Sequence, residues 1–368
     1  MQSMREPMGT LLRHTLLGPV GNRPGVAVRT TRMIGIRHTS SGGAMGDRRA
    51  GADWERFAES FSRVASNIQR VIQGKDEEVR LALCCLLAEG HVLIEDVPGV
   101  GKTMLAKALA RSIDCSFRRI QFTPDLLPSD ITGVNVFNQE RGDFEFKPGA
   151  VFANIVLGDE INRASPKTQA ALLESMEEHQ VTVDGVTYGL GTPFMVIATQ
   201  NPIEHEGTYP LPEAQLDRFM MRLSLGYPTA EAEAQILSTH GVASTLDDIS
   251  PIMDAPTVSA MISMAREVHV AVALQQYIVA MAEATRRHPD LYLGASPRAS
   301  IMLLRAARTM AASEGRDYVT PDDVKALAAQ VFAHRLLVSA DAAMGGRTAM
   351  SVLAEVLAQV PVPVRGKA

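Results

Sequence analysis

The 368-residue chain is poor in aromatic side chains, which make up 5% of it and include a single tryptophan. Proteins that bind single-stranded nucleic acid stack the bases on aromatic rings, so this scarcity counts against such a platform. The formal net charge is -5. A mildly acidic chain lacks the positive field that draws proteins to DNA or to anionic lipid. Nucleic acid is therefore not expected as a partner.

The chain also has little cysteine and no long apolar run. Cys84, Cys85 and Cys115 form no CxxC pair, which favours reduced thiols over disulfides or a zinc site. The most apolar run, residues 81–94, is interrupted by Glu89 and is shorter than the roughly 20 residues that a membrane-spanning helix needs. The sequence predicts a cytoplasmic location without membrane insertion.

Acidic residues are nearly missing from the first 46 positions, which hold six arginines and one glutamate. This composition is typical of an organelle transit peptide, but proline and glycine interrupt any amphipathic helix here. Two explanations are favoured over targeting. The segment is a disordered extension, or the start codon is assigned too early and Met45 is the true start. We therefore expect residues 1–52 to lie outside the folded part.

Beyond residue 53, apolar segments that are typical of buried strands alternate with helical patterns. Strands are predicted at 91–96, 117–122, 154–158, 194–199 and 221–225. This alternation predicts the α/β class, with the parallel sheet of a P-loop NTPase. After Pro228 only helical patterns remain, and no strand pattern appears. The predicted domains are an α/β core at 53–228, an all-helical lid at 229–360 and a flexible tail at 361–368.

Local signals predict the individual helices and one hairpin. Helices are expected at 54–70, 76–87, 103–113, 166–178, 212–219, 229–240, 257–268, 274–288, 297–312 and 321–334. Three of them begin with a hydroxyl residue followed by proline, at Ser165, Ser296 and Thr320, which caps the first turn. Residues 180–188 alternate around Asp184-Gly185, which indicates a tight β-hairpin.

A glycine-rich loop follows the first predicted strand and opens a helix, which is the context that a Walker A phosphate loop requires. Its backbone N–H groups and the helix N-terminus would face the phosphates. Lys102 is expected to reach the β- and γ-phosphates of ATP, and the Thr103 hydroxyl to bind Mg²⁺. The expected nucleotide-binding residues are Val97, Pro98, Gly99, Val100, Gly101, Lys102 and Thr103.

The first glycine of the usual motif is replaced by Asp96. A carboxylate would repel the polyphosphate unless it points away, so we expect a slightly different entry into the loop. Asp159 and Glu160 end a second buried strand 57 residues after Lys102. Two carboxylates in this place form a Walker B motif, in which Asp159 holds the metal and Glu160 activates the attacking water.

Three further polar residues are candidates for catalysis. Asn201 follows a third buried strand, at the sheet edge where open α/β sheets bind ligands, although it also suits a turn before Pro202. Arg218 is a candidate arginine finger for the neighbouring subunit's ATP, with a salt bridge to Asp217 or Glu213 as the alternative. Arg298 begins a lid helix, where a cation opposes the helix dipole, so a γ-phosphate contact is favoured.

Two residues close in sequence to these motifs are assigned no role. Arg163 follows the acidic pair and suits an interface, and His205 lies between two glutamates. A lone histidine in a charged loop is normally solvated, so a metal site at His205 is not favoured.

Together these motifs resemble the AAA+ ATPases. The run at 206–219, EGTYPLPEAQLDRF, is similar to the MoxR family in particular, and the resemblance covers about residues 54–336. It implies that Asn201 is sensor 1, Arg218 the finger and Arg298 sensor 2. It also implies that residues 71–74 lie near adenine, and that 125–152 and 180–188 are the helix-2 insertion and the hairpin before sensor 1.

The resemblance implies an ATPase that assembles into a ring, with a hexamer as the expected size. It would use Mg²⁺ and ATP to mature metal centres or remodel partner proteins. Such proteins often act with a separate von Willebrand A-domain protein, and none is encoded in this chain. Three alternatives stay open: a nucleotide-gated switch with negligible turnover, a magnesium-chelatase-like subunit, and a DNA motor, which the net acidity disfavours.

Overall fold

The computed structural model describes residues 43–202, 207–240 and 245–363. The expected extension up to residue 42, the loop with His205 and the last five residues lie outside the described residues. Helix α1 (Gly43–Gln69) begins inside the segment 1–52, which the sequence predicts to be an extension. Residues 45–368 cluster as one compact unit.

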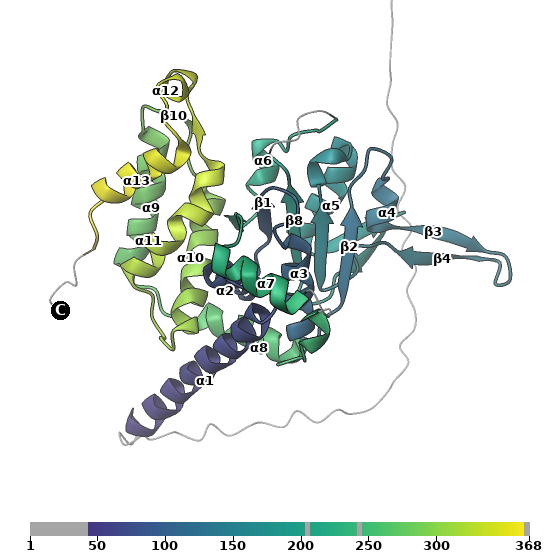
Figure 1. Cartoon of the computed structure of the whole chain (residues 1–368), viewed down its shortest axis with the longest axis horizontal. Coiled ribbons are helices and arrows are strands. Elements are labelled where there is room, and N and C mark those ends of the chain that lie inside the picture. The colour runs from purple at the N-terminus through teal and green to yellow at the C-terminus, as the bar shows by residue number, and fades with distance from the viewer. Residues whose placement is uncertain (1–42, 203–206, 241–244, 364–368) are drawn as a thin grey trace, which may run out of the picture. The chain divides into compact units, whose positions relative to one another are not determined.

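A five-stranded parallel sheet forms the centre of this unit (Figure 1). Its strands lie in the order β2-β5-β8-β1-β9, and all neighbours are parallel. The strand bounds are β1 Val92–Glu95, β2 Phe117–Gln121, β5 Ile155–Asp159, β8 Met195–Gln200 and β9 Met221–Leu223. The predicted parallel sheet is confirmed. Its inner strands are continuous apolar runs because both faces of the sheet are buried.

Helices on both faces of the sheet bury two apolar clusters. On α1, Phe57, Phe61, Val64 and Ile68 are all buried, as their spacing of three and four residues predicts. The other helices of this part are α2 Asp76–Leu87, α3 Lys102–Ser112, α4 Pro128–Thr132, α5 Pro166–Glu178 and the short α6 Glu213–Leu216, with a 3₁₀ turn η1 at Ile161–Arg163.

Two antiparallel hairpins leave the sheet layer. The predicted one pairs β6 (Gln180–Val183) with β7 (Val186–Gly189), and its turn residues Asp184 and Gly185 both have positive φ, as a two-residue hairpin turn requires. The second pairs β3 (Gly133–Asn138) with β4 (Asp143–Pro148) and projects from the sheet (Figure 1). The rings of Phe146 and Tyr188 stack at 3.9 Å and join the two hairpins.

The C-terminal part is helical, as predicted, and has one small addition. Strand β10 (Leu291–Leu293) pairs antiparallel with β11 (Leu337–Val338), although the sequence analysis finds no strand pattern there. Strands of two or three residues are too short to show a period. The helices are α7 Ala230–His240, α8 Ala255–Glu267, α9 Val272–Arg287, α10 Pro297–Ser313, α11 Pro321–Phe332, α12 Ala340–Met344 and α13 Ala349–Gln359, with 3₁₀ turns η2 Thr245–Asp248 and η3 Ala333–Arg335.

The expected helix caps are present. Ser165, Ser296 and Thr320 each accept a hydrogen bond from the backbone N–H three residues later, at the starts of α5, α10 and α11. These bonds satisfy one of the free N–H groups in each first turn. Among the described residues, no helix is both long and apolar enough to cross a bilayer.

Candidate active site

The phosphate loop connects β1 to α3. Gly99 and Gly101 have φ of 88° and 96°, and a Cβ built on either glycine would meet no atom within 4 Å. Positive φ is readily adopted only by glycine, and the open space lets a ligand approach the backbone. Lys102 begins α3, and its Nζ donates to the Asp96 carbonyl at 2.7 Å, so its ammonium group lies over the loop.

The Asp96 carboxylate is turned toward the segment after β9, and within the loop it binds the first residue, Val97. Its Oδ1 accepts from the Val97 N–H at 2.9 Å, and its Oδ2 accepts from the Gly226 N–H at 2.6 Å and the Ser224 hydroxyl at 3.1 Å. Burial alone would raise the pKa of Asp96, but the hydrogen bonds from Gly226, Val97 and Ser224 hold that pKa below its ordinary value. Asp96 therefore ties the loop to the end of β9, and its charge is compensated there.

The acidic pair lies at the end of β5. Asp159 Oδ1 accepts from the Thr199 hydroxyl at 2.6 Å, and the same hydroxyl oxygen accepts from the Glu160 N–H at 2.9 Å. Glu160 adopts a left-handed conformation with φ 57° and ψ 50°. Such backbone strain in a residue other than glycine is concentrated at functional sites. Thr199 thus fixes the Asp159 carboxylate and the Glu160 backbone relative to β8.

Two residues of the edge strand β2 belong to this site, and the sequence analysis misses them. Arg119 donates from Nε and Nη2 to Asp159 Oδ2 at 3.0 and 2.6 Å, and Gln121 Nε2 donates to Glu160 Oε2 at 2.9 Å. Their spacing of two residues on a strand places them on one face. The two-residue repeat of polar side chains in the strand is the sequence signal for Arg119 and Gln121. Gln121 pairs in register with Asp159, which brings this face of β2 to the acidic pair.

The strand order brings three of the predicted motifs together. Strand β8 lies between β5 and β1, so Asn201 follows β8 between the acidic pair and the phosphate loop. Asn201 is buried. Because the carboxyl ends of parallel strands meet at one edge of the sheet, Lys102, Asp159, Glu160 and Asn201 share that edge.

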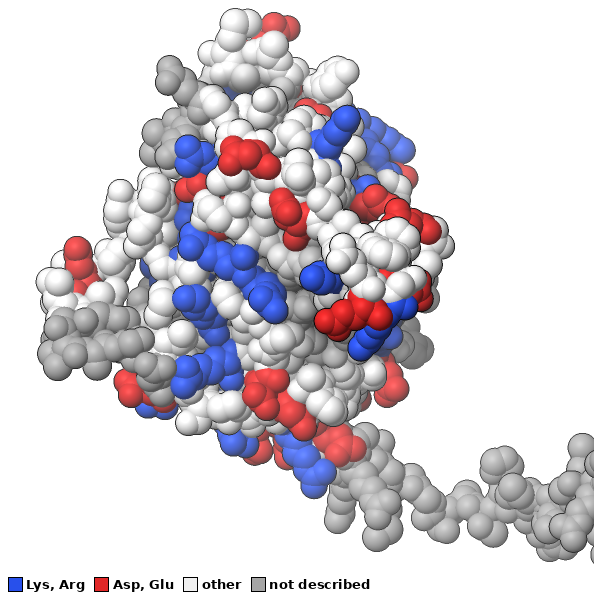
Figure 2. Space-filling model, turned by 90° about the vertical axis from the view of Figure 1, so that its right-hand side faces the viewer, with Lys and Arg blue, Asp and Glu red and all other residues white. Residues whose placement is uncertain are grey.

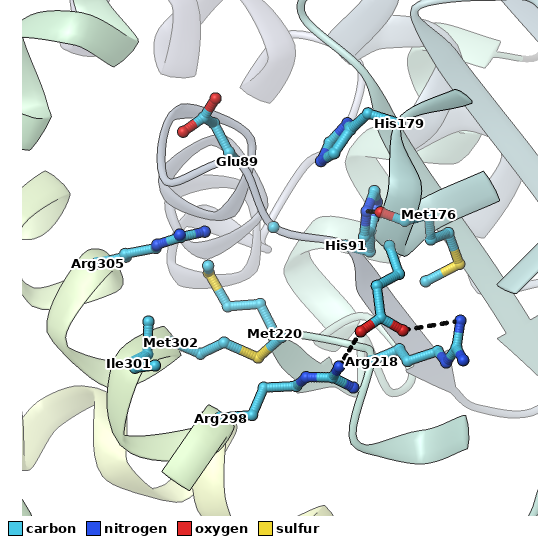
Figure 3. Close-up of a pocket in the computed structure, with 12 residues that line it drawn as sticks. Glu89, His91, Met176, His179, Arg218, Met220, Arg298, Ile301, Met302 and Arg305 are labelled. Atoms are coloured by element: carbon cyan, nitrogen blue, oxygen red, sulfur yellow. Dashed lines mark hydrogen bonds and ion pairs between the residues drawn. The ribbon is translucent and has the colours of Figure 1, made fainter. Parts of the chain in front are cut away.

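The two predicted arginines lie at the opposite edge. Arg218 and Arg298 line a cavity of about 250 Å³ together with Glu89, Gly90 and His91, which directly precede β1 (Figure 3). The phosphate loop follows the other end of β1. This strand has four residues, so its first and last Cα atoms are about 10 Å apart.

Arg218 and Arg298 converge on one carboxylate in this cavity (Figure 3). Arg218 Nη1 lies 3.2 Å from Glu177 Oε2, and Arg298 Nη2 donates to Glu177 Oε1. The partner of Arg218 is thus Glu177 on α5, and the alternative of a salt bridge to Asp217 or Glu213 is not what the structure shows. Arg218 lies in a turn beyond α6, since α6 ends at Leu216 and not at Arg218.

Comparisons with known proteins decide the family. A model of the ATPase family associated with various cellular activities (AAA) matches residues 91–221, and a model of the AAA lid domain matches residues 283–356. Chaperone MoxR1 of Mycobacterium tuberculosis is 42% identical over 313 residues, which cover 83% of this chain and 82% of the relative. The chain belongs to the MoxR family of AAA+ ATPases.

Other relatives agree with this assignment. The uncharacterised protein YeaC of Bacillus subtilis is 48% identical over 308 residues, covering 84% of this chain and 96% of YeaC. Protein MoxR of Methylorubrum extorquens is 31% identical over 319 residues, covering 78% of this chain and 89% of that protein. A solved structure of a candidate ATPase from Cytophaga hutchinsonii superposes with a TM-score of 0.81 at 37% identity, covering 87% of this chain and all of that one.

The MoxR-family site fits ATP and Mg²⁺. The open glycine backbone of the phosphate loop has room for phosphate oxygens. A carboxylate and a hydroxyl, from Asp159 and Thr103, are the hard oxygen donors that Mg²⁺ prefers. Both oxygens of Asp159 already accept hydrogen bonds from protein groups, so Asp159 suits contact through a water molecule. Within the described residues, no cluster of three or more His, Cys, Asp and Glu side chains offers another metal site.

Proposed function

We propose that this MoxR-family chain hydrolyses Mg·ATP at the boundary between two protomers of a closed ring. The observation that carries the proposal is the separation of the site into two halves. One half, with Lys102 and Glu160, lies at one end of β1. The other half, with Arg218 and Arg298, lies at the opposite end. One protomer would offer its phosphate loop to the arginines of the next.

Each residue of the first half then has a defined task. Lys102 and the loop amides bind the phosphates, and Thr103 and Asp159 are the residues that would hold Mg²⁺. The metal, when bound, supplies positive charge to the phosphate oxygens. Gln121 and Arg163 both donate to Glu160 Oε2, so Glu160 Oε1 is the atom expected to accept a hydrogen bond from the attacking water. Asn201 would orient the same water.

The arginines of the second half complete the site in trans. Guanidinium groups stabilise the charge that develops on a transferred phosphoryl group, and a trans arginine accelerates hydrolysis by about 10³–10⁵-fold. This arrangement differs from a sensor 2 that contacts the nucleotide of its own chain, because Arg298 is held at the far end of β1. A closed ring, with a hexamer as the expected size, provides such an interface to every protomer.

Remodelling of a partner protein is the proposed use of the ATPase cycle. The name of the relative Chaperone MoxR1 supports it. The projecting β3–β4 hairpin supports it as well, because the side chains of Phe137 and Phe144 are exposed there and contact each other edge-on. Exposed apolar groups of this kind mark protein-contact sites. A separate von Willebrand A-domain protein remains the expected partner, the client is unassigned, and the cytoplasmic location stays a prediction.

A DNA motor is not favoured by the surface. On the side of the molecule that faces the viewer in Figure 2, a band of Lys and Arg side chains is flanked by clusters of Asp and Glu. The acidic clusters beside this band and the net charge of -5 of the whole chain disfavour binding of a nucleic-acid backbone there.

Complementation between two inactive variants tests the proposal. Lys102→Ala removes phosphate binding but keeps the arginines, and Arg218→Ala removes an arginine but keeps the phosphate loop. Each variant alone should hydrolyse ATP at least about 10³-fold more slowly than wild type. A one-to-one mixture should recover about a quarter of the wild-type rate, the share of productive boundaries under random assembly.

The same assay separates the alternatives. A mixture that stays inactive while its protomers co-assemble would overturn the trans arrangement. Tight ATP binding without phosphate release in the wild type, at any protein concentration and with candidate partners, would favour a nucleotide-gated switch. Glu160→Gln is the matched control, since it should bind ATP normally. In a mixture with Arg218→Ala, a boundary should be inactive where Glu160→Gln supplies the phosphate loop. A boundary should be active where Glu160→Gln supplies the arginines and Arg218→Ala supplies the phosphate loop.

A further inference from the structure

The two oxygens of the Glu177 carboxylate are divided between two arginines from different parts of the chain. Oε2 pairs with Arg218, which follows α6 in the α/β part, and Oε1 pairs with Arg298, which begins the lid helix α10. Glu177 lies in the last turn of α5. One side chain therefore sets the distance between a core arginine and a lid arginine.

Within the part of the chain that the structure describes, Glu177 engages only one end of each arginine's guanidinium group. Arg218 uses Nη1 for Glu177 and for the Leu173 carbonyl at 2.5 Å, and Leu173 lies one helical turn before Glu177. Arg298 uses Nη2 for Glu177, and its Nη1 lies 4.0 Å from Asp217. A guanidinium carries five N–H donors in a rigid fork. Each fork is thus fixed at one end, and its other N–H groups can meet a phosphate.

The lid side of this cluster is fixed as well. Asp217 accepts from the Ser296 hydroxyl at 2.9 Å and from Arg335 Nε at 2.7 Å. Ser296 is the N-cap of α10, so Asp217 holds the helix end that carries Arg298 next to Arg218. Free rotation of Arg298 is opposed by Glu177, and movement of its helix is opposed by Asp217.

We propose that Glu177 is the positioning residue that presents Arg218 and Arg298 as a matched pair to the γ-phosphate of the neighbouring protomer's ATP. This inference rests on the proposed trans site. Glu177 does not touch the nucleotide of its own chain, because it lies at the opposite end of β1 from Lys102. Its effect passes to the next protomer through the two arginines.

The Glu177→Gln variant tests this role. A glutamine keeps one acceptor but turns an N–H₂ group toward a guanidinium, so one arginine loses its partner. We expect kcat to fall about ten-fold, which is less than the roughly 10²-fold loss that a 1 Å misplacement can cause, because one arginine keeps its partner. The KM for ATP should stay within about two-fold, because the nucleotide binds to the unchanged phosphate loop. Glu177→Asp, which keeps the charge on a shorter side chain, should lose less.

The control is Glu178→Gln on the same helix. Glu178 is exposed, and its side chain makes no hydrogen bond or ion pair with any other described residue, so this variant should match wild type in kcat and in thermal midpoint. Equal kcat values in Glu177→Gln, Glu178→Gln and wild type would overturn the inference.

A mixture with Lys102→Ala distinguishes a positioning role from a general structural one. The Lys102→Ala protomers cannot hydrolyse ATP, but they offer a correctly positioned arginine pair. At constant total protein, a one-to-one mixture with Glu177→Gln should be about three-fold more active than Glu177→Gln alone, given a quarter of productive boundaries. A rate that falls by half would mean that the variant damages its own phosphate loop, and would refute the inference.

The outcome also separates this inference from the proposed function. If Lys102→Ala rescues Arg218→Ala but not Glu177→Gln, the trans site stands and the role of Glu177 is refuted. If Lys102→Ala rescues neither, the trans site itself is refuted.

Discussion

Asp96 shows how a residue that departs from a motif can be compensated by its surroundings. Its carboxylate accepts hydrogen bonds from Val97, Ser224 and Gly226, so it joins the phosphate loop to the end of β9. The sequence predicts a slightly different entry into the loop. It does not predict the anchoring, because Ser224 and Gly226 lie about 130 positions further along the chain.

Asp96→Asn should lower the free energy of unfolding by about 1–3 kcal/mol. The asparagine amide would place an N–H₂ group against the Gly226 N–H or the Val97 N–H, and one buried donor would lose its acceptor. Urea unfolding measures the change. Asp114→Asn is the matched control, since Asp114 is exposed in a left-handed conformation that asparagine tolerates.

The affinity for ATP tests whether Asp96 acts as a structural anchor or through its charge on the phosphates. Because the carboxylate is turned toward the segment after β9, Asp96→Asn should change the Kd for Mg·ATP by less than about three-fold. A gain in affinity of ten-fold or more would mean that the charge of Asp96 acts on the phosphates, contrary to the contacts observed.

The position of a predicted residue in the fold follows from sequence where its motif is contiguous with a strand. The phosphate loop, the acidic pair and Asn201 each follow a buried strand, and adjacency of the strand ends places them together. Glu177 has no such signal, because α5 ends with Glu174, Glu177 and Glu178 at positions that sequence alone cannot rank. Its role depends on Arg218 and Arg298, which the fold brings to it.

At the scale of elements, His91 connects three of them. It precedes β1, its Nε2 lies 3.0 Å from the Met176 carbonyl on α5, and its Nδ1 accepts from the Val196 N–H of β8 at 3.0 Å. Both ring nitrogens are satisfied when the ring is neutral. Burial is the main cause that lowers the pKa of His91 to about 4.

This shift predicts a loss of stability in mild acid. Between about pH 6.5 and pH 4, His91 binds a proton in the unfolded chain but stays neutral in the folded protein. The contribution of His91 to the free energy of unfolding is therefore fully present above pH 6.5 and is lost as the pH falls through that range. The shift corresponds to roughly 3 kcal/mol. His91→Gln keeps one donor and one acceptor without titrating, so its unfolding free energy should depend less on pH by about that amount.

Chemical denaturation at pH 7 and at pH 4.5 measures the difference. His334→Gln provides a comparison, because burial also lowers the pKa of His334, whose Nε2 lies 3.1 Å from the Phe219 carbonyl. Identical pH dependence in His91→Gln and wild type would show that burial does not lower the pKa of His91, contrary to this prediction.

Element prediction follows the strength of the local signal. The β6–β7 hairpin is predicted because its Asp184-Gly185 turn requires positive φ and its strands alternate. The β3–β4 hairpin lacks a two-residue turn of that kind, since Asn138 and Asp143 enclose a longer loop. Strands β10 and β11 depend on each other across 44 or more residues, and no local pattern encodes that pairing.

At the scale of the whole molecule, Arg335 joins the lid to the α/β part. It follows α11 within η3, and its side chain is 2% exposed. It donates to the Asp217 carboxylate at 2.7 Å and to the carbonyls of Asp217 and Phe219 at 3.0 and 2.5 Å. These acceptors flank Arg218, so the lid is attached at the residue that the neighbouring protomer is proposed to use.

Arg335→Met should therefore weaken both stability and trans catalysis. Removal of one partner from a fully buried ion pair costs about 3–5 kcal/mol. The loss here should lie near the lower value, because Asp217 is partly exposed and keeps Ser296 and Arg298 nearby. Calorimetry should show a lower midpoint, whereas Arg287→Met, which breaks the exposed pair with Glu283, should change the unfolding free energy by less than about 0.5 kcal/mol.

Binding of Mg·ATP to the phosphate loop of the Arg335→Met protomer should persist below the midpoint. ATP hydrolysis by Arg335→Met should be lost and then recovered on mixing with Lys102→Ala, because the mixed ring again contains boundaries with an intact phosphate loop and a correctly anchored arginine pair. If Arg335→Met hydrolyses ATP at the wild-type rate, the position of the lid does not control the two arginines. The proposed coupling between the lid and Arg218 would then be refuted.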